Sequence, residues 1–381
     1  MKILIITGVR LNLGGGMEYY IADLVTHLYK KHEFTIVESE SGREYVDLKS
    51  KLKHAKIIAL GNRFGLDLPS ILDFLNLRKL FLKVDVVYYL SGFWNEIYSF
   101  ILQFLTGTPV VGLSWFLTDS EYRFKKNKLK ANESARAKLG TLVFGPSLIR
   151  IGRFFRRYQV VSKKDYDYLC NRWNNSEKIR EIEFGINLSK YTTCHKKTVF
   201  TILYMARLDY QKGSDLIPEI FKQVNKKIQD FRLIIVGSGK FEQTLKILAK
   251  QNKNIKFKGY ISKEDSTKEY MDNLCSSHVL ISPLRYAGTT FTTIEALASG
   301  TPVIEFDVPG TKERISNGVN GYVVEDLDEM VDRIAEIYLK WLDRNAYEIM
   351  AENARKSAQK FDLFDQIRKV EQLLLEASLH P

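Results

Sequence analysis

Short apolar runs alternate with stretches of helical periodicity along the first half of the chain. The apolar runs fall at 2–7, 34–37, 56–60, 84–89, 110–113 and 158–161. Runs of this length are typical of strands buried on both faces, and the helical stretches between most of them favour parallel pairing. The first half therefore predicts an α/β domain built on a parallel, doubly wound sheet.

The alternation starts again after residue 195. Strands are predicted at 199–205, 231–236, 255–257, 279–282 and 303–306, followed by a hairpin-like segment, GVNGYVVE. We therefore divide the chain into an N-terminal domain, 1–194, and a C-terminal domain, 195–361. A last helix, within 362–381, places Leu363, Ile367, Val370 and Leu374 on one face. That face needs an apolar partner, and we expect the helix to pack back on the N-terminal domain.

An uncharged stretch at 97–117 is long enough to raise the question of a membrane-spanning helix. Gln103, Gly107, Pro109 and Gly112 interrupt it, so it divides better into a buried helix followed by a buried strand. The N-terminal MKILIITGVR has too short an apolar part for a secretory signal and fits a first strand. We therefore expect a cytoplasmic protein.

The three cysteines, Cys170, Cys194 and Cys275, are odd in number and widely spaced, and no two form a CxxC pair. This pattern favours a reducing compartment and no metal cluster. The acidic pair Asp165 and Asp167 lies in a predicted helix, where residues two apart point to different faces. We therefore expect no metal site there.

The net charge of +12 lies almost entirely in residues 1–195, and within 123–164 Glu133 is the only acidic residue. A helical pattern late in this stretch places Arg150, Arg153 and Arg157 on one face. Its apolar face would hold Leu148, Ile151, Phe155 and Tyr158. A basic amphipathic helix suits an anionic membrane surface or a lipid-phosphate head group, although a solvated helix packed on its own domain fits equally well. No nucleic-acid-binding module is recognised in the sequence, so no nucleic-acid partner is expected.

The stretch 282–306, SPLRYAGTTFTTIEALASGTPVIEF, predicts a strand, a glycine-containing loop, a helix from Thr290 to Ser299 and a second strand. The first amides of such a helix have no intrahelical partner and attract phosphate oxygens. Glu295 lies about one turn inside the helix, where its carboxylate fits the two hydroxyls of a ribose better than phosphates that would repel it. A surface glutamate that favours a helix N-terminus is the alternative.

Three further loops follow predicted strands of the second half, at the edge where open α/β sheets bind ligands. Arg207 and Lys212, in MARLDYQKGSD, supply two cations that can neutralise a diphosphate leaving group, although taken alone they also fit a surface pair. Gly237 and Gly239, in VGSGKF, allow the backbone to approach a nucleoside closely. Tyr260, in FKGY, is a candidate for recognition of the base.

In this order the motifs resemble glycosyltransferase family 4, the retaining nucleotide-sugar transferases of GT-B fold. The matching segments are GGGMEYYIADLVTHL for the family's glycine loop and helix, EFGIN for its PNGVD turn, ARLDYQKG for R-x-x-x-x-K-G, VGSG for G-x-G and IEALASGTPVI for E-A-x-x-x-G-x-P-V-I. The resemblance covers nearly the whole chain. It implies two Rossmann-like doubly wound α/β domains facing an interdomain cleft, with the acceptor on the first domain and the donor on the second.

The resemblance also implies roles for single residues. Arg207 and Lys212 would be catalytic and would hold the diphosphate of a UDP- or GDP-linked sugar, with no metal and no other cofactor. Glu295 would bind the ribose. The remaining donor contacts would come from Gly15, Gly16, Gly237, Gly239, Tyr260, Gly288, Thr289, Thr290 and Phe291. The acceptor side would include Trp115, Arg150 and Arg153.

The expected activity is therefore a metal-independent, retaining transfer of a sugar to a glycan or to a lipid-phosphate-linked glycan, with peripheral binding to an anionic membrane. Ala287 stands where the family usually has a second Glu, and Trp115 stands where members often have a His near the reacting carbon. These positions keep open a second class of function, a catalytically idle subunit that binds sugar nucleotides. A GT-B epimerase or phosphorylase is a third.

Overall fold

The computed structural model describes residues 1–8, 10–13, 15–39, 47–60, 71–90, 93–114, 151–264, 266–285 and 290–379. The chain forms two compact units, Met1–Gly185 together with Phe364–Pro381, and Ile186–Leu363. The first unit thus ends at Gly185, whereas the sequence analysis set the boundary at residue 194. The reason lies in a backbone bridge, because Ile186 pairs with Asp362 and so already belongs to the second unit.

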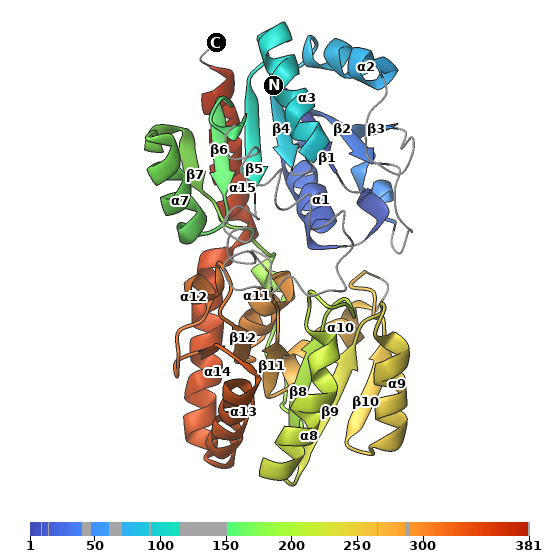
Figure 1. The fold of residues 1–381 in the computed structure, drawn as a ribbon, viewed down its shortest axis with the longest axis vertical. Helices are drawn as coiled ribbons and strands as arrows, with labels where there is room; N and C mark the ends of the chain where they lie inside the picture. The colour runs from blue at the N-terminus through green and yellow to red at the C-terminus, as the bar shows by residue number, and fades with distance from the viewer. Residues whose placement is uncertain are drawn as a thin grey trace. The chain divides into compact units, whose positions relative to one another are not determined.

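The described residues of the first unit build a seven-stranded parallel sheet with the order β3-β2-β1-β4-β5-β6-β7 (Figure 1). The strands are β1 (Lys2–Thr7), β2 (Glu33–Ser39), β3 (Ala55–Leu60), β4 (Val86–Leu90), β5 (Val110–Ser114), β6 (Arg157–Val160) and β7 (Ile179–Glu181). The helices are α1 (Gly16–Leu28), α2 (Ile71–Phe81), α3 (Phe93–Thr106), α7 (Lys163–Trp173) and α15 (Leu363–Ser378), with short 3-10 turns at Leu11–Leu13, Lys49–Leu52 and Ser176–Lys178.

The second unit builds a six-stranded parallel sheet with the order β10-β9-β8-β11-β12-β13 in its described part. The strands are β8 (Phe200–Met205), β9 (Phe231–Val236), β10 (Ile255–Gly259), β11 (Val279–Ser282), β12 (Val303–Phe306) and β13 (Gly321–Val324). The helices are α8 (Ile217–Lys227), α9 (Glu242–Gln251), α10 (Thr267–Ser276), α11 (Phe291–Ala298), α12 (Thr311–Arg314), α13 (Leu327–Leu342) and α14 (Arg344–Ala358), with 3-10 turns at Leu188–Lys190, Ser214–Leu216 and Gln359–Phe361. Strand order reverses between β8 and β11, which is the topological switch point where such sheets bind ligands.

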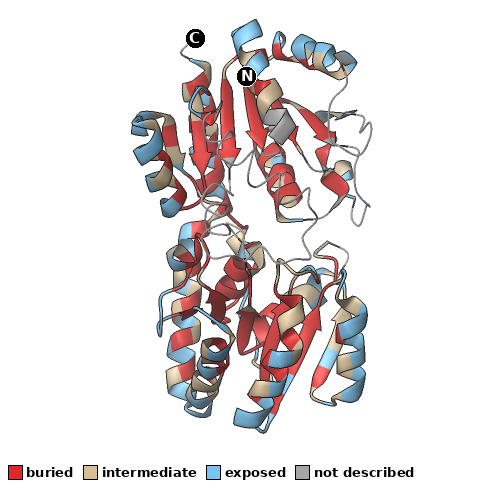
Figure 2. Cartoon of the chain, in the orientation of Figure 1, coloured by how far each residue is buried: buried red, intermediate tan, exposed pale blue. Residues whose placement is uncertain are grey.

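The strands are buried on both faces, as the predicted doubly wound architecture requires. Every residue of β8 is buried, and its side chains alternate between two apolar clusters. One cluster includes Ile217 and Val224 of α8, and the other includes Ile294 and Leu297 of α11. Figure 2 shows the same layering, with red strands between helices whose outer sides are exposed. The predicted α/β fold is therefore confirmed for both units.

The last helix, α15, belongs to the first unit from Phe364 onward. Its Glu371 carboxylate lies 2.9 Å from His32 Nε2 and 3.2 Å from Lys31 Nζ. Glu376 lies 3.4 Å from the guanidinium of Arg180 on β7. Its apolar side chains are buried: Ile367, Val370, Leu373, Leu374 and Ala377. A segment remote in sequence therefore completes the core of this unit.

The strand predicted at 158–161 is confirmed as β6. The helical pattern, whose apolar face was expected to reach Tyr158, ends earlier: in the described part of the basic stretch the last helical residue is Gly152, and a turn follows it. Backbone pairing of Arg157 with Val111 on β5 sets the conformation there in place of the helical spacing of the side chains. The predicted hairpin is wrong. The hairpin-like segment is instead β13, which pairs in parallel with β12.

The described part of the uncharged stretch, 97–114, divides into α3 and β5 as predicted. Within the part of the chain that the structure describes, no helix is both long and apolar enough to cross a membrane.

Candidate functional site

The loop after β8 carries Arg207 and Lys212, and Asp209 organises it. Arg207 Nε donates to Asp209 Oδ2 over 2.5 Å, and the backbone amide of Lys212 donates to Asp209 Oδ1 over 2.9 Å. Arg207 remains exposed and Lys212 is half-buried. Burial lowers the pKa of the Lys212 ammonium to about 8, and the charge of Arg207 adds to this effect. Two cations therefore lie in one loop, at the carboxyl end of a central strand.

Arg285, in the loop after β11, holds the Arg207 loop in place. Its guanidinium forms a bidentate pair with Asp215, with distances of 2.6 and 2.7 Å, and also donates to the carbonyl of Tyr210 over 2.6 Å. It stacks over the Tyr210 ring with its central carbon 3.8 Å from the centroid. The loops on either side of the switch point are thus joined by a charge-assisted contact that is mostly shielded from water. The sequence analysis did not single out Arg285 or Asp215.

The glycines after β9 pack against the same loop. A Cβ on Gly237 would lie 1.9 Å from the carbonyl oxygen of Ala206, and one on Gly239 would lie 2.6 Å from that of Leu208. The Leu208 amide donates to the Ser238 carbonyl over 2.8 Å. These glycines let two loops meet backbone to backbone around Arg207. Their contact with a nucleoside stays a prediction.

Glu295 lies in α11, as predicted, but protein side chains already bond its carboxylate. Oε1 accepts from the Tyr191 hydroxyl over 2.8 Å and from Lys263 Nζ over 2.5 Å, and Oε2 accepts from the Tyr270 hydroxyl over 2.5 Å. The Glu295 side chain is only 2% exposed. Burial acts to raise the pKa of Glu295, but the Lys263 charge and the three hydrogen bonds outweigh it and hold the pKa below its ordinary value. The carboxylate is therefore charged, and its protein partners shield it from solvent.

Glu305 on β12 is a second buried carboxylate near the start of α11. It pairs with Arg314 over 2.9 Å, and both side chains are fully buried. Thr290 donates to it over 3.2 Å and Thr293 over 2.5 Å. Burial acts to raise the pKa of Glu305, whereas Arg314 and the hydroxyl donors lower it further than burial raises it. An acid inside the apolar run VIEF was the sequence signal that could have revealed this group.

The remaining predicted donor residues occupy three places in the chain. Thr290 is the N-cap of α11, where its side chain makes no capping bond, and Phe291 begins that helix. Tyr260 is exposed beyond the end of β10. Gly15 is the N-cap of α1 in the first unit, and Gly16 is the first residue of that helix.

Four predicted residues lie outside the described residues: Gly288, Thr289, Trp115 and Arg150. On the predicted acceptor side Arg153 is exposed, and its guanidinium lies 5.3 Å from the centroid of the Phe154 ring.

Asp165 and Asp167 lie on different faces of α7, as predicted. Asp165 is buried and exchanges hydrogen bonds with Ser162 at the helix N-cap, over 3.0 and 3.1 Å. Asp167 is exposed and pairs with Lys163 over 2.6 Å. The two carboxylates thus have different partners, and the expectation of no metal site there stays a prediction.

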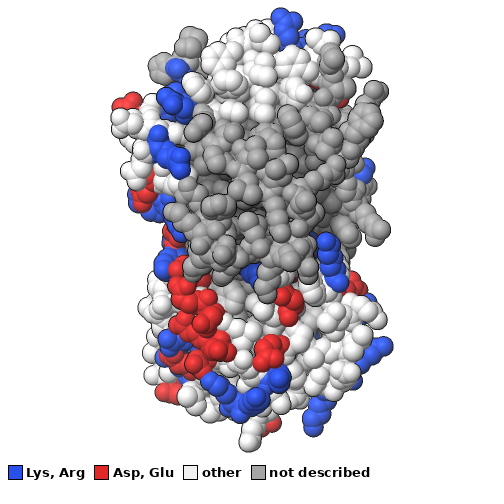
Figure 3. Space-filling view, viewed as in Figure 1, with Lys and Arg blue, Asp and Glu red and all other residues white. Residues whose placement is uncertain are grey.

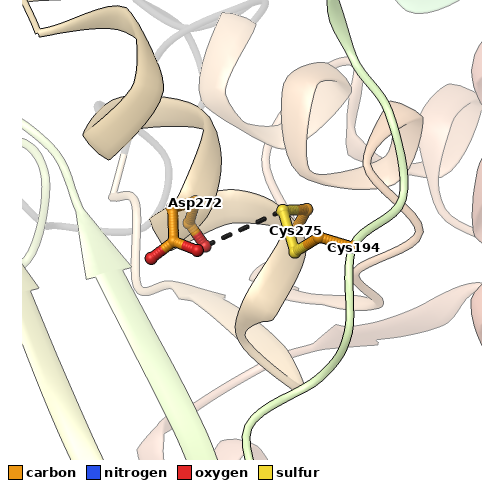
Figure 4. A group of neighbouring side chains, drawn as sticks. All are labelled: Cys194, Asp272 and Cys275. Carbon is orange, nitrogen blue, oxygen red and sulfur yellow. Dashed lines mark hydrogen bonds between the residues drawn. A yellow bond between two sulfur atoms is a disulfide. The ribbon is translucent and has the colours of Figure 1, made fainter.

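The structure joins Cys194 and Cys275 in a disulfide, which the sequence analysis did not foresee because their spacing of 81 residues carries no motif (Figure 4). The expectation of a reducing compartment, drawn from unpaired cysteines, therefore loses its basis. Asp272 lies beside the bond, and one potential ligand atom from each of these three residues falls within 4.8 Å of the others. Disulfide sulfurs are not thiolates, so the group is not a metal site in this state.

Comparisons with known proteins agree with this geometry. Residues 192–357 match the family profile named Glycosyl transferases group 1. An uncharacterised glycosyltransferase of Haemophilus influenzae is 31% identical over 154 residues, which are 38% of this chain and 43% of that protein. A GDP-mannose-dependent monoacylated alpha-(1-6)-phosphatidylinositol monomannoside mannosyltransferase of Corynebacterium glutamicum is 30% identical over 180 residues, 42% of this chain and 45% of that protein. The chain thus matches about half the length of these curated relatives.

Solved structures extend the similarity to both units. The Anabaena protein HepE in complex with UDP-glucose has a TM-score of 0.76 at 17% identity and covers 98% of this chain and 99% of its own. The pneumococcal O-GlcNAc transferase GtfA in complex with UDP and GlcNAc has a TM-score of 0.72 at 13% identity, and the similarity covers 100% of this chain and 99% of that protein's chain. At these identities the likeness concerns the fold. The chain therefore has the GT-B fold, and its residues 192–357 match the glycosyl transferases of group 1.

Proposed function

We propose that this chain is a retaining glycosyltransferase that uses a UDP- or GDP-linked sugar as donor. The observation that carries the proposal is the pair Arg207 and Lys212, held in one loop at the carboxyl end of β8 beside the switch point of the sheet. Proteins of the same fold hold UDP-glucose, or UDP and GlcNAc, in their structures. The relative from C. glutamicum is named for GDP-mannose.

The two cations would stabilise the departing diphosphate. As the bond between the anomeric carbon and the phosphate oxygen breaks, its electron pair moves to the diphosphate. The negative charge that develops on the diphosphate would be stabilised by the positive charges of Arg207 and Lys212. The acceptor oxygen then bonds to the anomeric carbon on the same face, and the acceptor proton goes to the leaving phosphate. Two fixed positive charges supply the neutralisation that a divalent cation would supply, so we propose a metal-independent reaction.

Glu295 would recognise the ribose, with a limit that follows from its partners. A carboxylate offers about four lone-pair sites. Tyr191, Lys263 and Tyr270 use three of them. One site remains, but because the side chain is only 2% exposed, a ribose hydroxyl reaches it only if a protein donor, such as Lys263, moves aside.

Replacement of either cation tests the proposal. Arg207→Ala and Lys212→Ala should each lower the rate of sugar transfer by about 100-fold or more, because each removes one charge that stabilises the leaving group. Lys250→Ala, at an exposed position near the end of α9, is the matched control and should leave the rate unchanged. Transfer is measured as release of UDP or GDP from candidate donors with a lipid extract as acceptor. Undiminished transfer by Arg207→Ala would remove the mechanistic basis of the proposal.

We further propose that the first unit docks on an anionic membrane and takes a glycan or a lipid-phosphate-linked glycan as acceptor, on the cytoplasmic face. Seven of its exposed apolar side chains lie on or just after α2, on α3 and in the turn before β6: Leu72, Leu75, Leu82, Ile101, Phe104, Leu105 and Phe154. Ring contacts link these elements, with the Phe74 and Tyr98 centroids 5.4 Å apart and those of Phe104 and Phe154 6.5 Å apart. Exposed basic side chains accompany them: Arg78, Lys79, Lys83 and Arg153.

In Figure 3 the surface over α2 and α3 is mostly uncharged, with basic side chains near it. Apolar side chains next to basic ones suit the interface of a bilayer with anionic head groups.

Vesicle flotation tests the membrane proposal. The double variant Phe104→Ser, Leu105→Ser should lose most of its binding to phosphatidylglycerol vesicles at low salt, because it removes two exposed apolar side chains from the patch. Leu339→Ser is the matched control, since Leu339 is equally exposed but lies in the second unit. Failure of the wild-type protein to float with anionic vesicles would count against docking and would leave the transfer reaction untouched.

A further inference from the structure

The segment that opens the second unit is fastened to the end of α10. Cys194 forms its disulfide with Cys275 near the end of that helix (Figure 4). Two residues later, Lys196 Nζ donates to the carbonyl of Ser277 over 2.7 Å. The backbone amide of Lys197 donates to the carbonyl of Ser276 over 3.1 Å. One covalent bond and several hydrogen bonds therefore join two parts of the chain that are distant in sequence.

The same two parts supply the tyrosines on Glu295. Tyr191 comes shortly before Cys194 in the opening segment, and its hydroxyl bonds Oε1 of Glu295. Tyr270 lies on α10, the helix that carries Cys275, and its hydroxyl bonds Oε2. The disulfide thus closes a ring of contacts that runs from Tyr191 to Cys194, across to α10 and back through Tyr270 to Glu295.

We propose that the Cys194–Cys275 disulfide is a positioning device for the donor site. It keeps the Tyr191 and Tyr270 hydroxyls bonded to opposite oxygens of Glu295. The orientation of the carboxylate, and so of the lone pair that remains for a ribose hydroxyl, is thereby fixed. Reduction removes the covalent bond and leaves the hydrogen bonds of Lys196 and Lys197 between the opening segment and the end of α10, so the alignment of Glu295 loosens. The inference rests on the proposed function, in which Glu295 binds the ribose.

The chemistry requires an external dithiol. A thiolate of the reductant attacks one sulfur of the disulfide, the sulfur–sulfur bond breaks, and a mixed disulfide forms. The second thiol of the reductant resolves it. Cys194 and Cys275 gain two electrons and two protons, and the dithiol becomes a disulfide. Cys194 is exposed and Cys275 is buried, so Cys194 is the accessible sulfur for the attack. In a cytoplasmic protein such a bond would be a redox-responsive one.

The test separates ribose recognition from general loosening. Binding of UDP and of 2′-deoxy-UDP is measured by calorimetry on the oxidised and the dithiothreitol-reduced protein, with GDP and 2′-deoxy-GDP as the alternative pair. The preference for the ribonucleotide should fall by roughly three- to tenfold on reduction, the loss expected when a hydrogen bond to a carboxylate weakens. If the disulfide had a purely structural role, reduction would weaken the binding of both nucleotides equally. The ratio of their affinities would then stay unchanged, and this result would overturn the proposal.

Variants assign the effect to the named residues. The double variant Cys194→Ser, Cys275→Ser should show the reduced preference under both conditions, and Tyr191→Phe should show it in the oxidised protein. Cys170→Ser, in the first unit, is the control and should behave as the wild type. Three free thiols in the purified, unreduced protein would also overturn the proposal.

Failure of the proposed function can be distinguished from failure of this inference. If no nucleotide binds in either state, the donor assignment is wrong. Hydrogen exchange then tests the coupling by itself: reduction should increase exchange of the α11 amides and of residues 186–191. Unchanged exchange there would show that the disulfide does not hold Glu295.

Discussion

The pH dependence of nucleotide binding should report the charge of Lys212. Burial, with the neighbouring Arg207, lowers the pKa of this ammonium to about 8 in the free protein. A bound diphosphate favours the charged form and raises the pKa in the complex. The affinity is therefore close to its full value at pH 7, is half of it near pH 8, and falls by about tenfold per unit well above pH 8, until the pKa of the complex is reached.

The size of the effect follows from the protonated fraction. This fraction is about nine tenths at pH 7 and about one tenth at pH 9, so the affinity for UDP or GDP should fall about tenfold, or ~1.4 kcal/mol, between them. Calorimetric titrations at several pH values measure it. Lys212→Arg is the matched control, because a guanidinium keeps its charge throughout this range. The same decline in both proteins would refute the assignment, since the titrating group would then lie elsewhere.

Three further predictions concern the second unit. Gly237→Ala should lower its free energy of unfolding in urea by ~2–4 kcal/mol and weaken nucleotide binding, because the new Cβ meets a backbone oxygen. Gly318→Ala, whose Cβ meets nothing within 4 Å, should cost only ~1–2 kcal/mol and leave binding unchanged; equal effects would contradict the reasoning. Arg314→Met should cost ~3–5 kcal/mol in the same assay because it leaves the Glu305 carboxylate buried without its ion pair, and a loss below ~1 kcal/mol would speak against that pair. Glu295 and Glu305 have pKa values below the ordinary 4.5, so their contribution to stability is present above pH 4.5 and lost as pH falls through the lower folded-state values. Thermal melting between pH 6 and 3 should show this loss, and it should be smaller in Glu295→Gln.

The amino-acid sequence alone was enough to predict the α/β class, most strands and the loop that holds Arg207 and Lys212. These features are local. An apolar run reports that a strand is buried, and a glycine or a cation in the following loop reports what the end of that strand can bind. The division of the 97–117 stretch into α3 and β5 follows from the same local signals.

Only the tertiary structure decided which side chains surround each charge. Tyr191 reaches Glu295 across 104 residues of sequence, and Arg285 reaches Asp215 across 70. Neither separation has a period or motif, because strand order and helix placement set it. The basic helical pattern ends at Gly152, short of Tyr158, for the same reason, since the chain beyond it pairs with β5. Periodicity says which positions are buried, whereas the contacts among buried charged groups depend on how the whole sheet is assembled.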